Sequence, residues 1–250
     1  MTKWLCGSVT AAAVLLMTGG VANAGDMDSR IESSAKQSYV FKTYLKDDNI
    51  VVQSKEGAVT LNGVVEEEFH KSLAEETVAG LPGVTGVTNN LQLKQSPPTA
   101  SSDAWIKNKV RVALLFHSNV NASATDVEVK GGVVTLRGKA NSQAQKELTA
   151  EYANDVDGVK RVSNEMSVVT EAPSKKTVGE IIDDASIKAQ VKMTLLFHRS
   201  TSALHTTVSV MRGVVTVSGE AKNGAEVDLV TKLVTDVYGV TGVVNKMSIK

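Results

Sequence analysis

Histidine is the residue type in this sequence that first suggests chemistry. His117 and His198 each follow a Leu-Leu-Phe run, and two such histidines would bind a metal ion or transfer protons if their rings met at one site. No cysteine or acidic residue recurs beside them at the spacing of metal ligands, and His70 and His205 have no counterparts elsewhere in the chain. We therefore expect no metal, no cofactor and no catalytic residue. His117 and His198 are interpreted as residues at helix C-termini, where the helix dipole favours a positive charge.

Glycines and adjacent carboxylates offer two further chemical interpretations. Gly132 and Gly138 bracket a short apolar run, but no Gly-rich motif precedes a helix in the way that a phosphate-binding loop requires. The glycines are therefore expected in turns, because a positive φ angle costs glycine little. Asp183 and Asp184 are interpreted as helix-capping residues rather than as a catalytic pair. The sequence favours a protein that is not an enzyme.

A second apolar stripe runs along the segment that begins at Asp103, and it is the best candidate for a binding surface. It lies on a different side from Ile106, Val110 and Leu114, which we expect in the core. Two interpretations stay open. The stripe packs against a neighbouring part of the chain, or it contacts a lipid surface or a protein partner, since tryptophan suits an interface and lysine meets anionic head groups. The residues of this candidate contact are Trp105, Lys109, Val112 and Phe116, with Met193 and Phe197 at matching places of a later repeat.

The elements that must position these residues occur three times. Each copy carries the run Gly-Val-Val-Thr-Leu-x-Gly or a close variant, followed twenty residues later by Gly-Val and then by an asparagine. A motif that keeps its register in several copies indicates a repeat architecture. The copies align without a gap as units 1, 2 and 3, which are residues 28–93, 103–168 and 184–249. The stretches 94–102 and 169–183 between them are expected to be linkers.

Unit 2 shows the local signals of secondary structure most clearly. Asp103 is a plausible N-cap for a first helix, and Asn141 for a second. Residues 125–129 and 133–136 fit the two strands of a hairpin, and Gly158 fits the C′ position of the second helix. With a last strand after this glycine, each unit has the predicted order α-β-β-α-β. The predicted fold class is α+β: three tandem domains, each with two helices packed on a small three-stranded mixed sheet. Because a domain of this size is marginally stable alone, we expect the units to pack together.

The first 24 residues have the features of a secretory signal peptide. Lys3 precedes the apolar run from Val9 to Met17, and Ala22 and Ala24 form a small-x-small site. We expect cleavage after Ala24 and a periplasmic mature chain. The one cysteine of the chain lies before the apolar run, so the mature protein is expected to carry no disulfide, no lipid and no transmembrane span.

The composition excludes further classes of protein. Lys and Arg number 27, and Asp and Glu number 27, which gives a net charge of zero. A dedicated nucleic-acid binder normally has a basic excess, so no nucleic-acid partner is expected. Unit 1 has 6 basic and 10 acidic residues, unit 2 has 9 and 8, and unit 3 has 7 and 5. This asymmetry would orient the molecule on an anionic surface, or it reflects ordinary variation between solvated faces.

The repeated run, the second helix and the closing pattern Gly-Val-x-x-Val-x-Asn-x-Met together resemble the BON domain family, which is named for bacterial osmotically induced and nodulation proteins. The resemblance covers all three units. It implies a non-enzymatic periplasmic module that binds phospholipid or envelope surfaces and protects the cell envelope under osmotic or related stress. The partners would be an anionic phospholipid surface or envelope proteins. The alternative is a protein-binding scaffold or chaperone-like factor for exported proteins, which edge strands would serve by strand addition.

Overall fold

The structure is a computed structural model of the 250-residue chain. It describes residues 21–95, 99, 102–169, 182–201 and 206–250. Most of the predicted signal peptide and most of the predicted second linker therefore lie outside the described residues. The last four residues of the predicted signal peptide form the start of the first helix.

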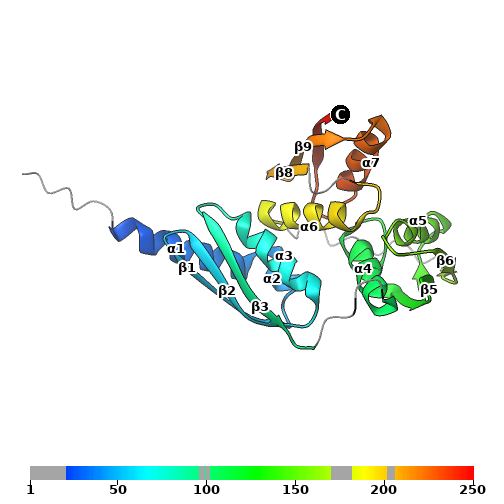
Figure 1. Ribbon diagram of the computed structural model, residues 1–250, viewed down its shortest axis with the longest axis horizontal. Helices are drawn as coiled ribbons and strands as arrows, with labels where there is room; N and C mark the ends of the chain where they lie inside the picture. The colour runs from blue at the N-terminus through cyan, green and yellow to red at the C-terminus, as the bar shows by residue number, and fades with distance from the viewer. Residues whose placement is uncertain (1–20, 96–98, 100–101, 170–181, 202–205) are drawn as a thin grey trace, which may run out of the picture.

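The described elements follow the predicted order in each unit, which confirms the fold class (Figure 1). Unit 1 consists of α1 (Val21–Gln37), α2 (Tyr39–Thr43), β1 (Asn49–Lys55), β2 (Ala58–Val65), α3 (Glu68–Ala79) and β3 (Gly86–Leu93). Unit 2 consists of α4 (Asp103–Phe116), the 3-10 turn η1 (Ala122–Ala124), β4 (Thr125–Lys130), β5 (Val133–Ala140), α5 (Gln143–Asn154), β6 (Arg161–Asn164) and β7 (Ser167–Val168). Unit 3 consists of α6 (Asp184–Phe197), β8 (Thr206–Met211), β9 (Val214–Ala221), α7 (Gly224–Thr235) and β10 (Gly242–Ile249).

The sheets of the three units share one topology. The middle strand pairs antiparallel with the strand before it and parallel with the strand after the second helix. The strand orders are β1-β2-β3, β4-β5-β6 and β10-β9-β8, and in unit 2 the short β7 continues the pairing with β5. Buried residues alternate along the middle strands, so the helices cover one face of each sheet and the other face meets solvent.

An aspartate at the start of each unit ties the first helix to the hairpin turn. The carboxylate of Asp103 accepts hydrogen bonds from the amides of Gly131 (2.7 Å) and Gly132 (2.9 Å). Asp28 and Asp184 make the same pair of bonds in their own units. These backbone bonds favour the anion and lower the pKa of Asp103. The aspartate and the following glycine keep a constant spacing in the three units because the aspartate side chain hydrogen-bonds to that glycine's amide.

Three predicted helix ends are corrected by the structure. The N-cap of α4 is Ser102, whose side chain accepts from the amide of Trp105, because the carboxylate of Asp103 is occupied by the hairpin. The N-cap of α5 is Ser142 rather than Asn141. Gly158 has a positive φ of 92°, as expected of its type, but it lies in the turn beyond the C-cap Asp155 instead of at the C′ position.

The first helix of unit 1 is broken where those of units 2 and 3 are continuous. Ser38 adopts an extended conformation (ψ 151°), and its hydroxyl accepts from the amide of Phe41. The break separates α1 from α2 and releases the amides of the first residues of α2 from the preceding helix.

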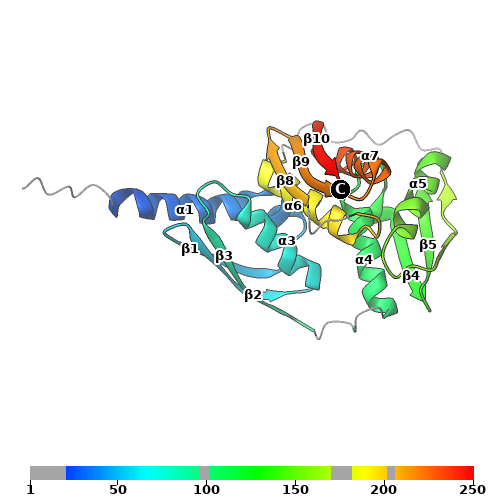
Figure 2. The same ribbon diagram turned by 45° about the horizontal axis from the view of Figure 1, so that its top comes forward.

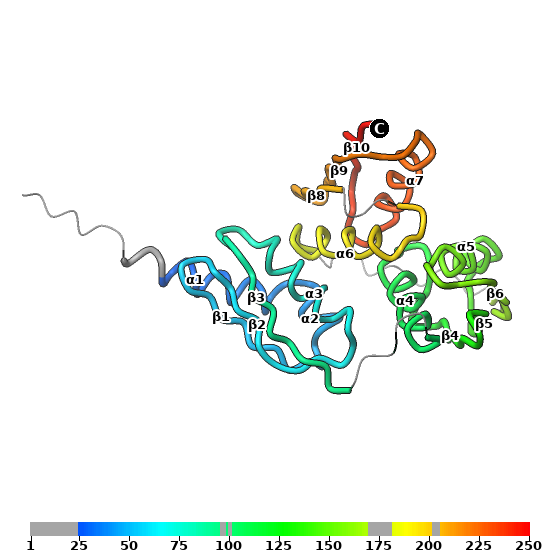
Figure 3. Tube along the Cα trace, viewed as in Figure 1, coloured from blue at the N-terminus to red at the C-terminus, as the bar shows by residue number. Residues whose placement is uncertain are grey.

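Units 2 and 3 form a pair through α4 and α6, and unit 1 lies against this pair with α3 on α6 (Figures 1 and 2). His117 bridges to Val237, and His198 bridges to Val156. His117 and His198 occupy one repeat position, and Val156 and Val237 occupy another. Each histidine therefore contacts the other unit at the same place, which gives the pair an isologous, two-fold arrangement. Figure 3 shows the chain running from unit 1 to unit 2 and then to unit 3 beside both.

Two apolar cores hold the molecule together, so the units pack as expected. The first core joins the interiors of units 2 and 3. The second is the interior of unit 1, closed by side chains from α4 and α6. We call these closing side chains the α4–α6 face: Val112, Phe116, Ala185, Ala189 and Met193.

Candidate functional site

The candidate functional features of this chain are surfaces. Among the described residues, no group of three or more His, Cys, Asp or Glu side chains is arranged to hold a metal ion. Three places combine polar chemistry with unusual burial or exposure: the seam between units 2 and 3, the α4–α6 face, and an apolar patch on unit 3.

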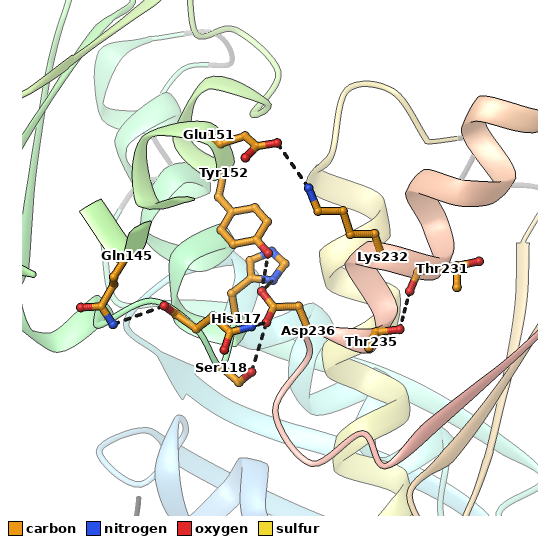
Figure 4. Close-up of polar contacts among 10 residues, drawn as sticks. His117, Ser118, Gln145, Glu151, Tyr152, Thr231, Lys232, Thr235 and Asp236 are labelled. Atoms are coloured by element: carbon orange, nitrogen blue, oxygen red, sulfur yellow. Dashed lines mark hydrogen bonds and ion pairs between the residues drawn. The ribbon is translucent and has the colours of Figure 1, made fainter. Parts of the chain in front are cut away.

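The seam is built around the carboxylate of Asp236, which follows α7 (Figure 4). Tyr152 and Asn119 donate hydrogen bonds to it, and Ser118 Oγ donates a third at 3.2 Å. His117 Nδ1 lies 3.2 Å from the same carboxylate, and its ring stacks on Tyr152 with the centroids 3.7 Å apart. Burial opposes ionisation of Asp236, but His117 and Tyr152 outweigh it and hold the pKa of Asp236 below its usual value. The seam therefore contains a buried anion that is satisfied from the opposite unit.

The other half of the seam pairs a histidine with an aspartate in the same way, but this aspartate is less buried. His198 Nε2 lies 3.4 Å from Oδ2 of Asp155, which occupies in unit 2 the repeat position of Asp236. Leu233 stands where unit 2 has Tyr152, so this half lacks the hydroxyl donor. The side chain of Asp155 is 33% exposed, against 7% for Asp236. Burial lowers the pKa of His198, and Asp155 opposes that shift only in part.

The seam accounts for the two histidines that the sequence singles out. Both are C-cap residues of first helices, but each finds its acidic partner in the other unit. That partner was missed because it lies far away in sequence. A signal was available: units 2 and 3 share a histidine and an aspartate at these two positions, whereas unit 1 has Lys42 and Gly80.

The packing of the units divides the predicted contact stripe. Val112, Phe116 and Met193 are 1%, 0% and 2% exposed and belong to the core of unit 1. For these three side chains the structure supports the packing interpretation, because unit 1 covers them in this arrangement.

Trp105, Lys109 and Phe197 lie partly buried at the edge of the seam. Lys109 Nζ lies 3.7 Å from the ring centroid of Trp105 and 5.7 Å from that of Phe197, within the range of cation–π contacts. It also lies 3.6 Å from Oδ2 of Asp157. Burial lowers the pKa of Lys109, and Asp157 opposes that shift. Lys109 is thus engaged by rings from two units and by a carboxylate.

Unit 1 docks on unit 3 through the break in its first helix. The amide of Tyr39 donates to Oδ2 of Asp183 (2.8 Å), and the amide of Val40 donates to Oγ of Ser186 (3.1 Å). Asp183 also caps α6 by accepting from the amide of Ser186, which confirms its predicted capping role. The same prediction for Asp184 is wrong, because its carboxylate accepts from the hairpin amides of Arg212 and Gly213. The start of α6 therefore satisfies the amides that the break releases.

An apolar patch remains open on the outer face of the unit 3 sheet. Met211, Val214 and Val244 are 74%, 39% and 42% exposed, and Met211 pairs with Val214 at the hairpin end of the sheet. Arg212 in the turn and Lys246 on β10 are exposed nearby. We call these five residues the unit 3 patch. At the apolar positions the other units have Lys55, Ala58 and Thr88 in unit 1, and Lys130, Val133 and Ser163 in unit 2, so only Val133 matches the residue of unit 3.

The repeat also matches a known family. The model of the BON domain matches residues 27–95, 102–170 and 183–250. The chain belongs to the BON domain family. This membership confirms the resemblance drawn from the repeated motif and covers each of the three units.

Several named proteins are similar to this BON chain. Osmotically-inducible protein Y of Escherichia coli (strain K12) is 31% identical over 143 residues, which are 56% of this chain and 71% of that protein. A 21 kDa hemolysin of Actinobacillus pleuropneumoniae is 34% identical over 45% of this chain and 59% of that protein. The outer membrane lipoprotein DolP of Haemophilus influenzae is 28% identical over 57% of this chain and 67% of that protein. A solved structure of CdsD, a structural protein of the type III secretion system of Chlamydia trachomatis, matches at 17% identity with a TM-score of 0.25 over 88% of this chain and 90% of that one.

Proposed function

We propose that this BON protein is a non-enzymatic, peripheral protein of the periplasm that contacts anionic phospholipid through the unit 3 patch. The observation that carries the proposal is the exposure of Met211, Val214 and Val244 on one sheet face with Arg212 and Lys246 beside them. Exposed apolar groups that cluster on a soluble domain mark interaction sites. None of the helices that the structure describes is long and apolar enough to cross a membrane, so the proposed contact is at the surface of the bilayer.

The chemistry of the patch fits a lipid interface. Full burial of one Val or Met side chain contributes about 1.5–3 kcal/mol, and each Lys or Arg near an anionic membrane contributes about 1 kcal/mol. Partial burial of three such side chains with two cations gives a weak and reversible association. The cations also make the association dependent on salt.

This patch replaces part of the contact surface expected from the sequence. Val112, Phe116 and Met193 are covered by unit 1, and Lys109 is engaged by Trp105 and its neighbours. The proposed lipid contact therefore moves from the first helix of unit 2 to the outer sheet face of unit 3. The names of the relatives, osmotically-inducible protein Y and outer membrane lipoprotein DolP, support a role at the cell envelope under osmotic or related stress.

Co-sedimentation of the chain from Gly25 onward with anionic vesicles at low salt tests the proposal. Met211→Lys installs the residue that units 1 and 2 carry at this position, so the fold tolerates it. Because the new lysine itself adds about 1 kcal/mol of attraction to an anionic membrane, loss of the apolar contact should weaken binding about tenfold relative to a variant that adds the same charge outside the patch, which corresponds to about 1.4 kcal/mol. Ser209→Lys, an exposed change on the same strand face, is the control and should retain binding. Equal binding of both variants, or no binding of the unmodified chain, would refute the proposal.

A further inference from the structure

The α4–α6 face beneath unit 1 is bordered by a matched pair of cations. Arg111 and Lys192 occupy the same repeat position on α4 and α6, beside Val112 and Met193 of the face. Because units 2 and 3 are related by the two-fold arrangement of the seam, the face has an apolar centre with a positive charge at each side.

Helix α3 of unit 1 lies across this face and makes an ion pair with each cation. Glu67, its N-cap residue, lies 2.9 Å from the guanidinium of Arg111. Glu76, nine residues later, lies 2.6 Å from the ammonium of Lys192. The occupant of the face is thus helix α3, with an acidic side chain near each end, together with Tyr44 at the end of α2, whose ring packs edge-on against Phe116.

The occupant does not fill the space that the pair of units offers. A cleft of about 390 Å³ lies between α3 and α6, and a second of about 180 Å³ lies between α3 and α4. The two clefts are related by the repeat, since Leu195, Thr206 and Val208 line the first where Leu114, Thr125 and Val127 line the second. Leu196, on the wall of the larger cleft, is 50% exposed. Apolar surface therefore remains available on both sides of α3.

We propose that the α4–α6 face is a receptor for helices that carry an acidic residue near each end, and that unit 1 is a detachable cover which a partner protein bearing such a helix displaces. Charge complementarity to Arg111 and Lys192 defines the partner. The unit 3 patch lies on a sheet face away from these helices, so this receptor does not depend on lipid binding.

The contact at Gly80 allows the cover to be locked or loosened. A Cβ atom on Gly80 would lie 3.1 Å from both Cα and Cβ of Ala185, slightly closer than the Cβ separation of about 3.5–4.5 Å in a disulfide, so a small outward shift of unit 1 would suit the bond. Gly80→Cys with Ala185→Cys should therefore lock unit 1 in place, and the sequence has no other cysteine after Cys6. Gly80→Asp should loosen the cover by the same crowding. Units 2 and 3 carry aspartate at this position, so unit 1 should still fold.

The probe is a helix-stapled, fluorescent peptide of residues 66–81, titrated into the chain from Gly25 onward. We expect the Gly80→Asp chain to bind it at least tenfold more tightly than the unmodified chain. The oxidised double-cysteine chain should not bind it, and reduction should restore binding. Gly86→Ser is the matched control, because nothing lies within 4 Å of a Cβ there, and it should leave the affinity unchanged.

Charge reversal tests the recognition itself. A peptide with lysine at positions 67 and 76 should lose binding to the Gly80→Asp chain and regain it when Arg111→Glu and Lys192→Glu are added. The receptor is refuted if the locked and reduced chains bind the peptide equally, or if the Gly80→Asp chain does not bind it. It is also refuted if that chain gains only vesicle binding or self-association.

Discussion

Asp236 is the residue whose replacement should most weaken the contact between units 2 and 3. Asp236→Ala removes a buried carboxylate that accepts from Tyr152, Asn119 and Ser118 and lies beside His117. Removing one partner of a buried ionic network typically costs about 3–5 kcal/mol, because the remaining polar groups stay buried without a partner. Asp155→Ala is a matched control at the same repeat position. Its carboxylate is 33% exposed, so the expected cost is only about 0–1 kcal/mol.

Hydrogen exchange followed by mass spectrometry measures this difference where it arises. The amide of Ser118 donates across the seam to the carbonyl of Asp236, and the amide of Arg199 donates to the carbonyl of Asp155. Protection of such amides reports the free energy of local opening. Asp236→Ala should lower protection along the whole seam by at least about thirtyfold more than Asp155→Ala, which corresponds to about 2 kcal/mol. If the two variants lose the same protection, the buried anion is not what holds the seam.

Two further predictions concern the turns and the pH response. Gly138→Ala should destabilise unit 2 by about 3 kcal/mol or more, because φ is 122° and the new Cβ would lie 1.9 Å from the carbonyl oxygen of Ala124. The control is Gly131→Ala, whose Cβ meets no atom within 4 Å and which should cost about 1–2 kcal/mol. Urea denaturation of both variants measures the difference in the free energy of unfolding. Seam protection should fall as the pH drops below the ordinary histidine value of 6.5, because burial lowers the pKa of His198 in the closed state, so the opened state binds the proton first. His198→Gln should flatten that pH dependence, and an unchanged slope would show that His198 is not its source.

The sequence predicted the elements well because their signals are local. The hairpin follows from strand runs separated by glycine, and the order α-β-β-α-β follows from the repeat. The predicted N-caps of α4 and α5 were each one residue away from the observed ones. Asp103 sits beside a helix start as a cap would, yet its carboxylate reaches the hairpin turn, a contact that only the folded unit defines. Likewise, Val112 and Phe116 form an apolar stripe whether a lipid or another unit covers them, so their periodicity does not identify the covering surface.

The arrangement of the units depends on contacts between different units, which the local sequence pattern of one unit does not show. The histidine of one unit meets the aspartate of another, and Gly80 replaces that aspartate where unit 1 approaches Ala185 closely. Comparing the three copies position by position therefore shows which pair shares a seam. The unit 3 patch is found in the same way, since methionine stands at position 211 where the other units have lysine.

The most direct test of the proposed lipid contact is a probe placed at one repeat position in each unit. Val244→Cys, Ser163→Cys and Thr88→Cys occupy equivalent places on the three outer sheet faces. In the chain from Gly25 onward each is the single cysteine, and a polarity-sensitive fluorophore on it reports entry into a bilayer. On anionic vesicles at low salt, the probe at position 244 should shift to the blue while those at 163 and 88 should not. Equal shifts at all three positions, or a shift confined to 163 or 88, would contradict the assignment of the unit 3 patch as the membrane contact.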